Sequence, residues 1–160
     1  MSLRRVDIAA PAFAYDPEDP DGFAAGVFRP GPELGAAVTG ISVYELPPGQ
    51  AVCPYHYEHA EEEWLLVLEG EVEVRHPDGT EALGPHRLVL FPIGPDGAHG
   101  IRNAGEATAR VLMFSNLAAL AATVYPDSDK IGVYPPGERH LFNRGDAVDY
   151  YHGEESGPRS

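Results

Sequence analysis

Turn-forming residues interrupt the chain repeatedly between residues 36 and 115, and this spacing limits the possible folds more than any other feature of the sequence. Short apolar or alternating stretches are separated by glycine- and proline-rich turns about every eight to twelve residues, which is typical of a sandwich or barrel of short strands. The turns fall at residues 46–49, 77–79, 84–85, 92–97 and 104–106. The sequence therefore predicts an all-β domain.

The elements follow from these boundaries. We expect strands over residues 36–45, 51–56, 64–68, 72–75, 80–83, 88–91, 99–103 and 107–115. The apolar run at 64–68 is nearly continuous and predicts a strand that is buried on both faces. Residues 116–122 are rich in alanine and leucine and predict a helical turn or short helix. We divide the chain into an N-terminal arm (1–36), a barrel (37–115) and a C-terminal extension (116–160) that packs on the barrel or on a partner subunit.

The side chains with the clearest chemistry lie in residues 49–70. Eight consecutive positions contain His56, Glu58, His59, Glu61, Glu62 and Glu63. In an extended chain His56 and Glu58 share one face, whereas His59 takes the other. A short turn then returns Glu62 or Glu63 beside them. Imidazole nitrogen with carboxylate oxygen suits zinc, iron, manganese, nickel or cobalt. The alternative is an acidic, solvated turn with incidental histidines.

Charge and cysteine content exclude several classes of protein. The formal net charge is −14 and the chain contains a single lysine, Lys130, so we expect no nucleic-acid partner and no anionic membrane surface. A small molecule or another protein is the expected partner. The one cysteine, Cys53, excludes an internal disulfide and a cysteine-built metal site. Its strand parity differs from that of His56, so we interpret Cys53 as a packing residue.

No apolar run reaches the length of a membrane span. Two arginines, Arg4 and Arg5, lie near the start of the sequence, but Asp7 and Pro11 interrupt any signal-peptide core. We therefore expect a cytoplasmic protein.

Two segments resemble the motifs of the cupin family. Residues 49–70 resemble the first motif, although Glu58 stands where the second histidine of His-x-His is usual, and Glu63 and Gly70 keep the usual spacing. The second motif is matched by Pro92, Gly94, His99 and Asn103, with a loop two residues longer than usual. The resemblance covers residues 37–115 and extends to short phrases found in small bacterial single-domain cupins, many of them sugar-phosphate-isomerase-like.

The resemblance implies a double-stranded β-helix, or jelly-roll barrel, that binds one divalent metal ion. Carried over residue by residue, the metal ligands are His56, Glu63 and His99. Three interpretations remain for the missing histidine: Glu58 binds the metal as a fourth ligand, His59 takes its place, or the metal is lost and acidic groups alone bind the ligand.

The function implied is catalysis on a small polar, oxygen-rich molecule. In a metal-dependent isomerase of the sugar-phosphate type, Glu58 or Glu62 acts as the catalytic base that moves a proton between adjacent carbons. Tyr55 or Tyr57 would orient the substrate. With iron, the same centre would support an iron-dependent dioxygenase. The alternative is a cupin that binds its small molecule without turnover.

We also expect a homodimer. Open sheets need protected edges, and the flanking segments are too apolar to be free tails. The arm and the extension are therefore expected to cover the barrel or the partner's sheet edges.

Overall fold

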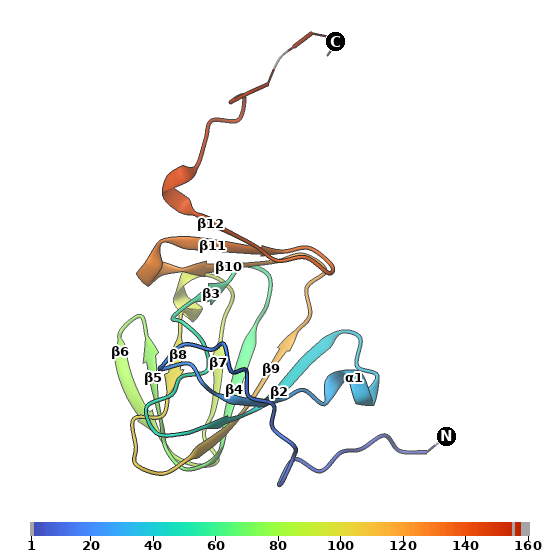
Figure 1. The fold of residues 1–160 in the computed structure, drawn as a ribbon, viewed down its shortest axis with the longest axis vertical. Coiled ribbons are helices and arrows are strands. Elements are labelled where there is room, and N and C mark those ends of the chain that lie inside the picture. Colours follow the sequence, from blue (N-terminus) through green and yellow to red (C-terminus); the bar gives the residue numbers. More distant parts are fainter. Residues whose placement is uncertain (1, 155, 158–160) are drawn as a thin grey trace.

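The computed structural model describes residues 2–154, 156 and 157, and it is built almost entirely from antiparallel strands (Figure 1). The elements in chain order are β1 (Gly26–Phe28), α1 (Gly31–Leu34), β2 (Thr39–Leu46), β3 (Tyr57–Glu58), β4 (Glu63–Glu69), β5 (Val72–His76), β6 (Gly79–Leu83), β7 (Leu88–Phe91), β8 (Gly100–Arg102), β9 (Ala109–Asn116), β10 (Ala121–Tyr125), β11 (Lys130–Tyr134) and β12 (His140–Asn143), with short 3₁₀ turns at Pro95–Gly97, Pro126–Ser128 and Arg144–Asp146.

The strands form three sheets. The largest has the order β1-β2-β9-β4-β7, a second has the order β6-β5-β8, and a third has the order β12-β11-β10-β3. The third sheet lies across one end of the barrel in Figure 1. The arrangement confirms the predicted all-β fold and is consistent with a jelly-roll barrel.

The hydrophobic core lies between the two sheets that form the barrel. Leu65 and Val67 of β4 and Val111 of β9 are fully buried, and they belong to one apolar cluster with Val72 of β5 and Ile101 of β8. Burial alternates along β4, as expected for a strand with one face on the core.

The outer face of β4 is only half-buried, so the prediction of a strand buried on both faces was wrong. Trp64 and Leu66 project there. Their registered neighbours on β7, Leu90 and Leu88, are exposed.

Two other predicted elements differ from the structure. Residues 52–55 are bends, and only single bridges, at Ala51 and His56, remain of the strand predicted over 51–56. The predicted helix over 116–122 is absent, because β9 continues to Asn116 and β10 begins at Ala121. There the strand pairings of β10 with β3 and β11 override the helical preference of alanine and leucine.

The N-terminal arm packs on the barrel of the same chain. Ala14 and Val27 form a β-bridge, which brings the arm beside β1. The hydroxyl of Tyr15 donates to Glu45 of β2 (2.7 Å), and Arg110 donates to the carbonyl of Ala9 (2.9 Å). No helix among the described residues is long and apolar enough to cross a membrane.

Gly97 lies where any side chain would collide with the backbone. A Cβ added there would lie 1.7 Å from the carbonyl oxygen of Pro92. We therefore predict that Gly97→Ala lowers the free energy of unfolding by about 2–4 kcal/mol, measured by urea denaturation. Gly84→Ala is the matched control, because a Cβ at Gly84 meets nothing within 4 Å. Equal stability of the two variants would contradict the prediction.

Candidate metal centre

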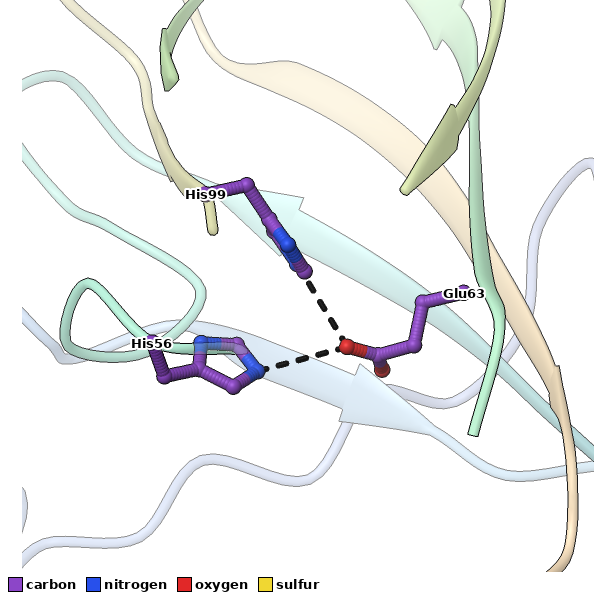
Figure 2. A group of neighbouring side chains, drawn as sticks. All are labelled: His56, Glu63 and His99. Carbon is purple, nitrogen blue, oxygen red and sulfur yellow. Dashed lines mark ion pairs between the residues drawn. The ribbon is translucent and has the colours of Figure 1, made fainter. Parts of the chain in front are cut away.

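Three side chains from separate parts of the chain converge inside the barrel. Glu63 Oε2 lies 3.3 Å from His56 Nε2 and 3.5 Å from His99 Nε2. The candidate ligand atoms of His56, Glu63 and His99 all lie within 4.8 Å of one another. Figure 2 shows both imidazole rings directed at the carboxylate. We call these three residues the His–Glu–His cluster.

The backbone itself joins the two histidines. His56 and His99 form an isolated antiparallel bridge in which the amide of each donates to the carbonyl of the other, at 3.0 and 2.8 Å. Both residues lie in loops, between bends and β3 in one case and between a 3₁₀ turn and β8 in the other. The bridge therefore fixes the relative position of side chains that are far apart in the sequence.

Backbone carbonyls also set which nitrogen of each ring is free. His56 Nδ1 lies 3.0 Å from the carbonyl oxygen of Pro54, and His99 Nδ1 lies 2.9 Å from that of Gly97. A carbonyl oxygen only accepts, so each Nδ1 carries the proton. In the neutral rings both Nε2 lone pairs then face Glu63, which is how metal-binding histidines are usually held.

Glu63 reaches the histidines because β4 alternates. Its side chain shares the inward face with Leu65 and Val67, and it pairs in register with Ser115 of β9 and Phe91 of β7. The ring of Phe91 stacks on that of His99 at 3.7 Å between centroids. The first residue of β4 thus places its carboxylate beside the stacked rings of Phe91 and His99.

The cluster contains buried polar atoms without hydrogen-bond partners. These atoms include His99 Nε2 and Glu63 Oε2, and His99 as a whole is only 1% exposed. Two imidazole nitrogens and one carboxylate oxygen converge here, and His99 Nε2 and Glu63 Oε2 have no hydrogen-bond partner. This donor set fits a divalent transition-metal ion. A bound ion would satisfy these atoms together.

Without a metal, the two histidines differ in their affinity for a proton. Burial disfavours the charged form of His56, but the neighbouring Cys53 and Glu63 outweigh it and raise its pKa. Burial and the charge of His56 lower the pKa of His99 to about 4. Burial alone would raise the pKa of Glu63, whereas the two histidines lower it. One proton therefore resides on His56, and a metal ion must displace it.

Glu58 lies beside the cluster but outside the group of converging ligand atoms. Its Oε1 is 3.8 Å from His56 Nε2 and accepts a hydrogen bond from the Thr123 hydroxyl at 2.6 Å. Its Oε2 is buried and has no hydrogen-bond partner. Burial raises the pKa of Glu58 to about 7, and the charge of Glu63 adds to the rise.

The structure does not bring the other predicted residues to the cluster. Glu62 is exposed, and alternation from Glu63 turns its side chain to the opposite side of the strand. His59 is also exposed, with its ring edge-on to Tyr57. Tyr55 packs under the guanidinium of Arg75. Neither of the tyrosines predicted to orient a substrate lines the cavity described below.

Cys53 lies closer to the cluster than its predicted strand parity suggested. In an extended strand Cys53 would point away from His56, but the bends at 52–55 bring Cys53 Sγ to 3.5 Å from His56 Nδ1. The sulfur therefore contacts the side of the ring that faces away from Glu63.

A cavity of about 610 Å³ reaches the cluster at His56. Its lining includes Arg29, Tyr44, Cys53, His56, Glu58, Glu61, Ala121, Thr123, Tyr125 and Tyr134. Thr123 and Tyr125 come from β10 and Tyr134 from β11, so the third sheet forms one wall. The hydroxyls of Tyr125 and Tyr134 are 2.8 Å apart. No motif in the sequence marks these wall residues, so they could not be predicted from it.

Residues 42–115 match the family model described as Cupin domain. No curated protein shows significant sequence similarity to the chain. Among solved structures, the chain is similar to the proposed sugar phosphate isomerase of Acidithiobacillus ferrooxidans, with 26% sequence identity and a TM-score of 0.75 over 80% of this chain and 81% of that one.

Two further solved structures share the fold at lower identity. The sugar phosphate isomerase of the cupin superfamily from Silicibacter pomeroyi has a TM-score of 0.79 and 19% identity, over 89% of this chain and 94% of that one. The polyketide cyclase RemF of Streptomyces resistomycificus has a TM-score of 0.58 and 24% identity, over 72% and 80% of the two chains. The likeness therefore extends beyond the matched residues 42–115.

Removing either histidine is predicted to weaken metal binding. We expect His56→Ala and His99→Ala each to weaken metal affinity at least about tenfold, since each removes one of three donors. The measurement is elemental analysis of protein purified without chelators or a metal-affinity tag. His59→Ala is the control, and we expect it to keep the metal content of the wild type. Unchanged metal content in both cluster variants would contradict the site.

The pKa of Glu58 predicts a pH-dependent loss of stability in the metal-free protein. Its pKa is raised from 4.5 to about 7 on folding, so between these values the folded state binds more protons than the unfolded state. The free energy of unfolding therefore falls as pH rises through this window. In Glu58→Gln the fall should be about 1–3 kcal/mol smaller. Urea denaturation in the presence of a chelator at pH 4.5 and 8 measures the fall in the free energy of unfolding for each protein.

Glu62→Gln serves as the control for this measurement, because it makes the same chemical change at an exposed position. It should follow the wild-type pH dependence. A Glu58→Gln profile parallel to that of the wild type would show that the carboxyl group of Glu58 does not titrate as expected.

Proposed function

Because residues 42–115 of this chain form a cupin domain, we propose that the cavity binds one divalent metal ion through the His–Glu–His cluster and acts on a small, oxygen-rich molecule. The observation that carries the proposal is the convergence of two Nε2 atoms and one carboxylate oxygen, with each Nδ1 held by a backbone carbonyl. We propose an aldose–ketose type of isomerisation as the reaction.

A bound divalent ion would supply Lewis-acid polarisation of a hydroxy-carbonyl ligand, and iron would in addition supply redox chemistry with dioxygen. The protein's own part is to hold the ligand and to move a proton. The buried ring of Phe91 stacks on His99 and covers that side of the cluster.

Glu58 is the proposed proton carrier. With a pKa of about 7, both its protonated and its ionised forms are populated near neutral pH, as a group that takes and returns a proton requires. Thr123 holds Oε1, which leaves Oε2 available beside the cluster. In the reaction, Glu58 removes the proton from the carbon that bears the hydroxyl and delivers it to the neighbouring carbonyl carbon. The proton of that hydroxyl passes to the former carbonyl oxygen, so that the hydroxyl and the carbonyl exchange places. We do not retain Glu62 in this role.

The proposed ligand class agrees with the lining of the cavity. Hydroxyl groups of Tyr125, Tyr134 and Thr123 face it and can bond to a polyhydroxylated molecule. The similarity to the proposed sugar phosphate isomerase of Acidithiobacillus ferrooxidans supports the same class.

A second candidate is an iron-dependent dioxygenase. Two histidines and one carboxylate are the donor set of many non-haem iron oxygenases, and the cluster offers that set. The two candidates differ in whether dioxygen is consumed, so one experiment separates them.

We predict that the metal-loaded protein exchanges a carbon-bound proton of a hydroxy-carbonyl sugar with solvent. Aldose and ketose phosphates are incubated in D₂O with manganese- or iron-loaded protein, and deuterium next to the carbonyl is followed by NMR. Glu58→Gln should slow the exchange at least about 100-fold, as expected for loss of a general base, while its metal content is unchanged. An oxygen electrode monitors the same mixtures.

The control is Glu62→Gln, which we expect to exchange at the wild-type rate. Oxygen uptake without exchange would replace the isomerase by the dioxygenase. Absence of both, with metal and sugar bound, would identify a cupin that binds without turnover.

A further inference from the structure

Arg29 lies between two adjoining cavities at the mouth of the barrel. It follows β1 directly, and it lines both the cavity in front of the cluster and a neighbouring cavity of about 350 Å³. Tyr44 also lines both, and Glu63 lines the second. The two cavities therefore give Arg29 and the His–Glu–His cluster a shared opening.

Arg29 carries the single positively charged guanidinium or ammonium group among the described residues that line these two cavities. It is exposed, and no described carboxylate lies within ion-pair distance of it. Two other arginines of the barrel have carboxylate partners: Arg75 binds Asp127 through both terminal guanidinium nitrogens, and Arg110 binds Glu45. The guanidinium group of Arg29 is therefore available to bind a group from outside the chain.

The acidic residues of the opening are already engaged. Glu63 faces the two histidines, Glu58 accepts from Thr123, and Glu61 accepts from the backbone amide of Ala118 at 2.8 Å. The positive charge of Arg29 instead acts on Tyr44, where it opposes the rise in pKa that burial causes. Arg29 and Tyr44 line both cavities.

Hydroxyl groups connect the cluster to Arg29. Ser42 and Tyr44 share the inward face of β2, and Ser115 of β9 lies in register with Glu63. All three residues line the second cavity. A ligand that extends through this cavity from Glu63 to Arg29 can bond to these hydroxyls.

We infer that Arg29 binds the anionic group of the ligand, a phosphate or a carboxylate, at the end opposite the oxygen atoms that reach the cluster. Guanidinium binds either oxyanion through two parallel hydrogen bonds. The inference rests on the proposed function for the position of the ligand, and it narrows the substrate class to anionic hydroxy-carbonyl compounds.

The test uses three sugars that differ only at the far carbon: D-fructose, D-fructose 6-phosphate and D-fructuronate. Their dissociation constants are measured by isothermal titration calorimetry on the full chain incubated with manganese. The variants are Arg29→Gln, Arg29→Lys and, as a control with the same loss of charge, Arg87→Gln, an exposed residue outside both cavities.

We expect the wild type to bind at least one anion more tightly than fructose, and Arg29→Gln to lose about tenfold or more of that affinity. Its affinity for fructose and its manganese content should be unchanged. Arg29→Lys should recover part of the loss, and Arg87→Gln should resemble the wild type. A loss confined to the phosphate or to the carboxylate would identify which oxyanion is bound.

Wild-type affinity for both anions in Arg29→Gln, or no preference of the wild type for either anion over fructose, would overturn the inference. Failure of the inference about Arg29 can be distinguished from failure of the proposed function. If elemental analysis finds no manganese in the wild type while anion binding still depends on Arg29, the anion site stands and the metal centre does not.

Discussion

The reciprocal pair of backbone hydrogen bonds between His56 and His99 is the interaction on which the site depends. It holds together two loops that have little regular structure of their own. The carbonyls of Pro54 and Gly97 then orient the rings, so that both free nitrogens meet Glu63. Because every one of these contacts uses the main chain, the geometry is set by the course of the backbone. Side-chain packing is then needed only to exclude water from the cluster.

The barrel supplies that packing and the third member of the cluster. Leu65 and Val67 anchor β4 in the core, and strand alternation then leaves Glu63 facing inward at the strand's first position. Phe91 covers His99 from β7. The energetic cost of burying the carboxylate of Glu63 is thus offset by the packing of the sheet that holds it.

Much of the fold and the centre of the site could be predicted from the sequence, because turns and alternation are local signals. His56, Glu63 and His99 lie at spacings that a family motif records, and the structure brings them together. The position of Cys53 could not be predicted, since it depends on bends that break the strand period. Nor could Thr123, whose hydroxyl meets Glu58 across a separation of 65 residues. Contacts between residues so far apart in the sequence produce no periodic pattern from which they could be predicted.

The residues of the site come from two separate parts of the chain. The His–Glu–His cluster comes from the barrel, whereas Thr123, Tyr125 and Tyr134 come from strands that follow it in the chain. Substitutions in those later strands can reshape the cavity without disturbing the loops that hold the histidines. Selection can therefore act on the two parts separately, and descendants of one ancestral barrel can keep the same cluster while they diverge in the molecules that they accept.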